Sequence, residues 1–228
     1  MPISNKHNDF PKRLCLLIQL LFKNLVLLVT YHSFWHSQHR SPSELNNTAL
    51  DEKRIIKACL KGKKNAQKAI YDAHKGVMFA LCLRYASSRE EAEDILQDGF
   101  LKVYRDLHQY KPSAPLGAWI RRVMVNTALE NIRKKNRRPQ THGNEVNSWD
   151  KVTTDDPSTE MNAKDLTAII QGLPEDFRLV FNLVAMEGHS HKDVAKMLNI
   201  SESNSKVRLT RARSLLQEKI TLIFEIDR

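Results

Sequence analysis

Glycine, proline and cysteine are all scarce in this chain. Its 228 residues include only 7 Gly and 8 Pro, and few segments alternate apolar and polar residues as β-strands do. Because most apolar residues instead recur at spacings of three and four, we predict an all-α fold. The three cysteines are odd in number and lack the spacing of a metal site, which indicates reduced thiols in a cytoplasmic protein.

Acidic residues are also in the minority. The chain has 36 Lys and Arg against 26 Asp and Glu, and its formal net charge of +10 favours a polyanionic partner. Nucleic acid is the first candidate and an anionic membrane surface is the second. A cationic surface that is simply solvated is the alternative to both.

Motifs of the common enzyme classes are absent. The sequence contains no Gly-rich phosphate loop, Walker-type lysine, CxxC pair or Ser-His-Asp order, so neither a catalytic site nor a cofactor is predicted. His189 and His191 have no further metal ligands at a suitable spacing, and Ser190 between them is expected to cap a helix. We therefore predict no metal site.

The first 48 residues differ from the rest of the chain. Segment 14–29 is apolar at all but three positions, yet it is too short and too interrupted for a confident membrane span. No small-x-small cleavage site follows it, which argues against a signal peptide. We interpret residues 1–48 as an extension outside the working domains, with a membrane-surface helix as the second interpretation and a true span as the third.

The remainder divides into two helical domains. Residues 49–138 are expected to form the first, and residues 166–228 the second, with three or four short helices. Between them, residues 139–165 carry six carboxylates against two lysines and few large apolar side chains. This composition is typical of a flexible acidic linker.

Capping residues mark several expected helix starts. Ser88 and Ser190 each stand three residues before an acidic residue, as in a capping box. Asn65 is expected to cap the long helix that follows it. The helix containing residues 119–138 is expected after a break at 111–117, where two prolines and a glycine interrupt the pattern.

The helix expected over residues 119–138 separates an apolar stripe from a cluster of cations. Its polar side has seven cations and a single carboxylate, and such charges repel one another unless an anion is bound. Asn126 lies among the cations, and an amide is suited to discriminate a base. Trp119 would either stack on an unpaired base or pack in the core at the head of the stripe, and the core position is favoured.

A helix-turn-helix signature lies in the second domain. The segment "HKDVAKML" (191–198) is followed by a short turn and then by a basic helix. Ile200 is expected to fill the turn. The inner side of the basic helix is expected to bury Val207, Leu209, Leu215 and Leu216.

A concentrated acidic face is expected on the helix over residues 90–106. Paired carboxylates such as Asp94 and Asp98 can bind a divalent cation or act as acid and base, but no plausible nucleophile lies beside them. They can also be a solvated face. Within an otherwise cationic chain, we interpret the face as a docking surface for a protein partner.

The order of these motifs closely resembles that of a bacterial sigma-70 family transcription initiation factor of the extracytoplasmic-function (ECF) type, over about residues 50–220. The resemblance implies a protein that is not an enzyme alone, binds core RNA polymerase at the beta-prime clamp helices and the beta flap, directs it to promoter DNA and helps open the duplex. An anti-sigma factor is a further partner found for many family members. Residues 1–48 have no counterpart in the family.

The resemblance also assigns contact residues. "AEDILQDGFLKVYR" (92–105) is similar to the segment that docks on the clamp helices, which implies contacts at Asp94, Gln97, Asp98, Phe100, Leu101 and Tyr104. "SAPLGAW" (113–119) is similar to the loop that holds a flipped base of the minus-ten element, and "VNTALENIRKK" (125–135) to the adjoining recognition helix. Minus-ten contacts are then expected at Trp119, Arg121, Arg122, Asn126, Arg133, Lys134 and Arg137. Minus-thirty-five contacts are expected at Ser203, Asn204, Ser205, Lys206, Arg208 and Arg211.

Other functions use the same features differently. A free-standing helix-turn-helix regulator would use the DNA-binding elements but would not need the acidic helix. A membrane-associated signalling protein would be anchored by segment 14–29, with the DNA elements secondary. A metal-dependent nuclease is a third and more distant interpretation.

Overall fold

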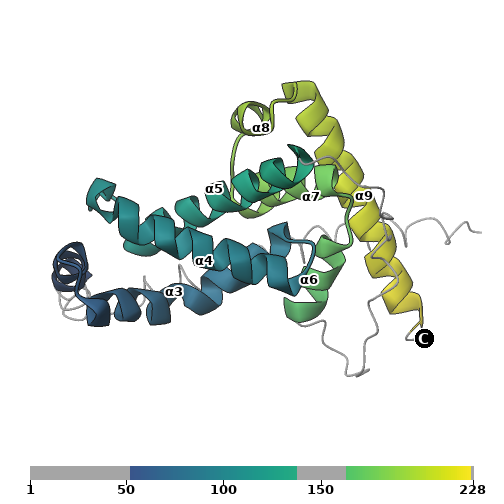
Figure 1. Ribbon diagram of the computed structural model, residues 1–228. Coiled ribbons are helices and arrows are strands. Elements are labelled where there is room, and N and C mark those ends of the chain that lie inside the picture. The colour runs from purple at the N-terminus through teal and green to yellow at the C-terminus, as the bar shows by residue number, and fades with distance from the viewer. Residues whose placement is uncertain (1–51, 138–162, 227–228) are drawn as a thin grey trace, which may run out of the picture.

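The computed structural model describes residues 52–137 and 163–226 (Figure 1). The predictions for residues 1–48, including the apolar segment 14–29, fall outside these ranges, as do those for most of the linker. Among the helices of the described ranges, none combines the length and the apolarity needed to cross a membrane.

Three long helices form the first domain. They are α3 (Lys64–Tyr85), α4 (Arg89–Asp106) and α5 (Leu116–Arg137), and each packs against the other two (Figure 1). A shorter helix over residues 52–60 precedes them. Their shared core includes Leu81, Ile95, Ile120 and Met124, all with no more than 1% of their surface exposed. This core fixes the outer faces of α4 and α5, which carry the candidate contact residues.

The second domain consists of shorter helices and one long one. α6 (Ala163–Gln171) leads into α7 (Glu175–Phe181), which continues as a π-helical turn, η3 (Asn182–Met186). α8 (His191–Leu198) and α9 (Glu202–Ile226) follow, and α9 packs against both α7 and α8. No strand occurs in residues 52–137 or 163–226, so the prediction of an all-α protein with two helical domains is confirmed for these ranges.

Two of the predicted caps are present and one is not. The hydroxyl oxygen of Ser88 accepts a hydrogen bond from the backbone N–H of Glu91, and that of Ser190 accepts one from the backbone N–H of Asp193. The prediction for Asn65 is wrong, because α3 begins one residue earlier and its N-cap, Lys63, has no side-chain cap bond. Gly62, with a φ of 73°, turns the chain into that position.

Two helix starts lie inside segments predicted to be irregular. α5 begins at Leu116, within the predicted loop 113–119, because the carbonyl of Pro115 accepts the N–H groups of Ala118 and Trp119 and Leu116 is buried. α6 begins at Ala163, within the predicted linker 139–165. The burial of Ile169 and Ile170 gives α6 a packed face that the acidic composition before it did not indicate.

The two domains pack against each other. The side-chain amide of Gln171 donates to the carbonyl of Leu83, and the buried amide of Asn182 donates to the carbonyl of Arg84. Buried apolar residues of both domains belong to one hydrophobic cluster. Figure 1 shows α6 and α7 beside the bundle of α3, α4 and α5.

Two helical glycines are expected to respond to alanine in opposite directions. No atom lies within 4 Å of where a Cβ would stand at Gly76, so Gly76→Ala should raise the free energy of unfolding by about 1 kcal/mol through helix propensity. A Cβ at Gly99 would collide with the side chain of the buried Met124, so Gly99→Ala should lower it by about 1–3 kcal/mol. Urea denaturation measures both changes, and a stabilising Gly99→Ala would show that Met124 moves aside.

Candidate functional site

The outer face of α4 combines acidic and apolar side chains. Asp94, Gln97, Asp98 and Leu101 are all exposed and follow one another at spacings that place them on one side of the helix. Leu101 is 66% exposed. Within the described ranges, neither Asp94 nor Asp98 forms an ion pair. A large apolar side chain next to unpaired carboxylates is typical of a protein-docking surface.

Two of the predicted contact residues on α4 face inward instead. Contrary to the sequence prediction, Phe100 lies in the core, 3% exposed, with its ring centroid 4.8 Å from that of Tyr71. Tyr104 is half-buried, and its hydroxyl donates to the carbonyl of Gln67 at 3.0 Å. Burial raises the pKa of Tyr104 to about 12. Both rings therefore hold α4 against α3 rather than extend the exposed face.

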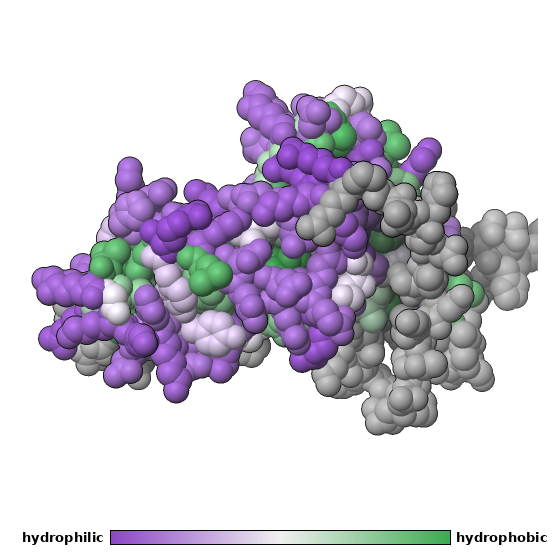
Figure 2. All heavy atoms as spheres, in the orientation of Figure 1, coloured by the Kyte–Doolittle hydropathy of each residue, from purple (hydrophilic) through white to green (hydrophobic). Residues whose placement is uncertain are grey.

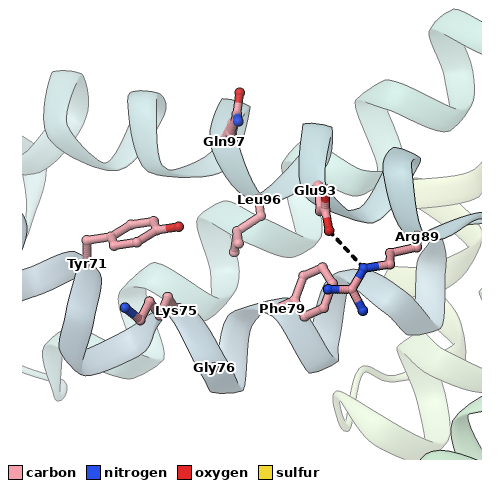
Figure 3. A pocket seen from close by; sticks show the side chains of 8 residues that line it. All are labelled: Tyr71, Lys75, Gly76, Phe79, Arg89, Glu93, Leu96 and Gln97. Carbon is pink, nitrogen blue, oxygen red and sulfur yellow. Dashed lines mark hydrogen bonds and ion pairs between the residues drawn. The ribbon is translucent and has the colours of Figure 1, made fainter.

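A shallow groove of about 380 Å³ runs beside this face, between α3 and α4 (Figure 3). Leu96 points between Tyr71 and Phe79, while Gln97 points away from α3 and belongs to both groove and face. The guanidinium group of Arg89 lies 5.2 Å from the ring centre of Phe79. The groove was not predicted from the sequence. The aromatic residues Tyr71 and Phe79, eight positions apart on α3, are the sequence feature that indicates it.

The cations of α5 fall on one exposed side. Arg122, Asn126, Arg133 and Arg137 are exposed and separated by four, seven and four residues, so they share a helix face. Lys134 is exposed beside them. The predicted apolar stripe is confirmed at Ile120, Met124, Thr127, Ala128 and Ile132, which are buried, and Val123 is half-buried.

Figure 2 shows that the face of the molecule turned to the viewer is predominantly hydrophilic, with small hydrophobic patches.

Trp119 does not offer an exposed ring on which a base could stack on the cationic side of α5. It is half-buried, packs against the core cluster, and meets the ring of Tyr110 edge-on at 5.8 Å. The favoured prediction, that Trp119 packs rather than stacks on a base, agrees with this position.

The helix-turn-helix pair is present in α8 and α9. Asn199 adopts the left-handed conformation at the end of α8, and the hydroxyl of Ser201 accepts the N–H of Asn204 at the start of α9. The half-buried Ile200 packs between the helices as predicted. Four of the predicted DNA contacts on α9 are exposed: Ser203, Asn204, Lys206 and Arg211. Arg208 is mostly covered and pairs with Asp176 at 3.0 Å.

Two positions on α9 have the opposite orientation to the one predicted. Ser205 is fully buried, and its hydroxyl lies 2.9 Å from Nδ1 of His191, so it does not face solvent or DNA. Val207, expected to be buried, is 50% exposed. The inner stripe of α9 runs through residues 205, 209, 212, 216 and 220, whose spacings of three and four include Ser205 and exclude Val207.

Ser205 and Ser203 allow a matched test of this assignment. Ser205→Ala should lower the free energy of unfolding by about 1 kcal/mol, because it removes a covered hydrogen bond to His191. Ser203→Ala, at an exposed position, should change it by less than about 0.5 kcal/mol. Thermal or urea denaturation of the two variants would decide. Equal stability of both would contradict the burial of Ser205.

A buried cluster of charges joins the two domains. Glu187, just after η3, accepts hydrogen bonds from Arg84 at 3.0 Å and from Nε and Nη2 of Arg121 at 2.5 and 3.0 Å. Burial lowers the pKa of the Arg84 guanidinium, which Glu187 partly offsets, and burial raises the pKa of the Tyr85 hydroxyl. Arg121, predicted to contact DNA, is held here by Glu187. Neither Arg84 nor Glu187 was predicted from the sequence to be a functional residue.

In the described ranges, no group of three or more His, Cys, Asp or Glu side chains is arranged to hold a metal ion.

Two family models match the chain in the order of its two domains. Sigma-70 region 2 matches residues 70–138, and Sigma-70, region 4 matches residues 163–216. The chain belongs to the sigma-70 family. The first model covers most of α3 and all of α4 and α5, and the second covers α6 to most of α9. The acidic face of α4, the cationic side of α5 and the start of α9 therefore lie within the matched residues.

Several curated relatives of this sigma factor are of the ECF type. The ECF RNA polymerase sigma-E factor of Haemophilus influenzae is 27% identical over 75% of this chain and 96% of its own length. The ECF RNA polymerase sigma factor SigW of Bacillus subtilis is 27% identical over 74% of this chain and 96% of its own length. Among solved structures, the sigma factor RpoE in complex with the anti-sigma factor NepR from Bartonella quintana matches with a TM-score of 0.44 and 23% identity, covering 71% of this chain and 98% of that one.

Proposed function

We propose that this ECF sigma factor binds core RNA polymerase through the exposed face of α4 and directs it to promoters through α5 and α9. The observation that carries the proposal is the joint match of both sigma-70 regions to a chain whose α4 presents Leu101 on the same side as the unpaired Asp94 and Asp98. The clamp helices of the beta-prime subunit are the proposed partner of this face, and the beta flap that of the second domain. Sigma factors are not enzymes, and no catalytic step is assigned to the chain.

The exposed side of α5 is the proposed minus-ten surface. Arg122, Arg133, Lys134 and Arg137 would hold phosphates, which positions the DNA without reading it. Asn126, exposed among them, would contact a base or the melted strand, because its amide can donate and accept at once. This surface would bind partly single-stranded DNA and help to open the duplex.

The start of α9 is the proposed minus-thirty-five surface. Ser203, Asn204, Lys206 and Arg211 are exposed on one end of the second helix of the pair, where such helices enter the major groove. Arg208 would join them after leaving Asp176. Ser205 is not included, because its side chain is buried against His191.

The two DNA surfaces must move apart to bind both elements together. Elements centred 25 base pairs apart are separated by about 85 Å along B-form DNA. In the structure, Arg133 of α5 donates to the carbonyl of Met197 in α8, so the minus-ten surface contacts the helix that precedes the minus-thirty-five surface. Residues 138–162, between the described ranges, can reach at most about 80–90 Å when extended, which is long enough for the separation.

The direct test is to mix the purified chain with bacterial core RNA polymerase. Co-elution in gel filtration and new, promoter-dependent transcripts from genomic DNA templates are the expected results. DNA binding without polymerase binding would instead favour a free-standing regulator. A cytoplasmic location follows from the proposal, because core polymerase and promoter DNA are there. An anti-sigma factor is a further partner that we propose from the family alone.

A further inference from the structure

The contact between the domains holds more positive than negative charge. Arg84 and Arg121 both bind Glu187, and the exposed fractions of the three side chains are 7%, 25% and 5%. One buried cation and one partly covered cation therefore share one anion. Burying a charge without full compensation is unfavourable, so this contact is less stable than its number of hydrogen bonds suggests.

Buried polar atoms without partners also lie along the contact between the domains. Nη1 of Arg84, the hydroxyl of Tyr85, Nε of Arg178 and Oδ1 of Asn182 are covered and have no hydrogen-bond partner among the described residues. Arg84 and Tyr85 belong to α3, and the other two belong to α7 and η3, which pack on it. Such atoms would gain partners if the two domains separated and water or a ligand entered.

The Arg84–Arg121 pair has the chemistry of a phosphate site. Arg121 meets the two oxygens of the Glu187 carboxylate with Nε and Nη2, which is the fork geometry that arginine uses for both carboxylates and phosphates. Arg84 binds one of the same oxygens and has Nη1 still free of a partner. The two non-bridging oxygens of a phosphodiester would replace those of Glu187.

We propose that Arg84 and Arg121 form a binding site for a DNA phosphate, and that Glu187 occupies this site while the two domains are in contact. The proposal deepens the proposed function, on which it rests, by adding Arg84 to the DNA surface and by making the domain contact self-inhibiting. Arg121 precedes Arg122 of the minus-ten surface by one residue, about 100° round α5, so the site would lie beside that surface. Separation of the domains releases both arginines at once.

Other contacts act in the same direction. The guanidinium of Arg133 donates a hydrogen bond to the carbonyl of Met197, and the amide of Asn136 donates one to Glu175 at 2.8 Å. Both belong to the cationic end of α5, and both partners belong to the second domain. In this conformation, the second domain therefore covers groups that phosphates would otherwise bind.

The test is DNA affinity without polymerase. Full-length wild type and Glu187→Gln are titrated into a fluorescein-labelled 30-base-pair duplex with a short unpaired centre, and anisotropy is read at several salt concentrations. Glu187→Gln should bind at least tenfold more tightly. Asp72→Asn is the matched control, since Asp72 pairs with Lys75 in an exposed contact on α3, away from the DNA surfaces, and its loss changes the net charge equally. It should change affinity by less than threefold.

A double variant separates the phosphate site from simple opening. Adding Arg84→Gln to Glu187→Gln should remove most of the gain and reduce the slope of log K against log salt by about one, as for one lost phosphate contact. Unchanged affinity in Glu187→Gln would overturn the proposal. A gain that persists without Arg84, with an unchanged slope, would overturn it as well.

Circular dichroism confirms that each variant is folded, and small-angle scattering should show a larger radius of gyration for Glu187→Gln. If Glu187→Gln does not fold, Glu187→Asp takes its place, since the shorter carboxylate keeps the charge but cannot reach both arginines, and it should bind DNA at least threefold more tightly. Because polymerase is absent from these measurements, failure to bind core polymerase would refute the proposed function and leave this result standing.

Discussion

Replacing both Asp94 and Asp98 with arginine is expected to abolish the complex with core RNA polymerase. The two carboxylates are exposed, unpaired among the described residues, and lie seven and three residues before Leu101 on the outer face of α4. Reversal replaces attraction to a basic partner by repulsion at two adjacent points of one interface. We expect at least a 100-fold loss of affinity, equal to about 2.7 kcal/mol or more.

Charge alone must be separated from position in this test. Asp72→Arg/Glu130→Arg changes the net charge by the same amount within the same domain, at exposed residues of α3 and α5 that lie outside the face of α4. This control should bind core polymerase within about threefold of wild type. Gel filtration detects the complex, and competition against a labelled sigma factor gives its affinity. Equal losses in both double variants would remove α4 from the interface.

The local features of this fold could be predicted because their causes are local. Ser88 and Ser190 cap helices as expected, since each hydroxyl needs only an N–H three residues away. The buried stripe of α5 follows from apolar residues at spacings of three and four. For the same reason, Arg122 and Asn126 are on the exposed side, where the sequence pattern places them.

The errors arise where tertiary packing chooses between local options. Ser205 and Val207 stand two residues apart, and the apolar valine was the natural choice for the inner side of α9. His191 of α8 offers the serine hydroxyl a partner at 2.9 Å, and the stripe that ends at Ile220 passes through Ser205. Asn65 likewise loses its capping role because Gly62 turns the chain earlier.

The charge cluster between the domains could not be predicted at all. Arg84 and Glu187 are 103 residues apart in the sequence, and each looks like an ordinary surface charge near a helix end. Only the packing of α6 and α7 against α3 brings them together. In the same packing, not all of the cations of α5 are available to bind DNA, because Arg121 and Arg133 already have partners in the second domain.

Asn126→Ala is expected to reduce promoter-dependent transcription by about 10–100-fold while leaving the complex with core polymerase intact. Asn126 is exposed on the cationic side of α5, and its side chain does not help to hold the helix together, so the substitution should leave the fold intact. Loss of a paired base contact costs about 1–3 kcal/mol. Run-off transcription measures the effect, with Asn131→Ala as control, because that amide stands five residues further along the same helix, about 140° round from Asn126.

The pattern across promoter variants distinguishes a base contact from a phosphate contact. If Asn126 reads a base, Asn126→Ala should flatten the preference at one position of the minus-ten element and leave the other positions unchanged. Arg122→Gln, which removes a proposed phosphate contact, should instead weaken all promoters alike and reduce the salt dependence of binding. A uniform loss with Asn126→Ala would assign its amide to the DNA backbone, and the discrimination of bases would then have to come from another exposed group on this side of α5.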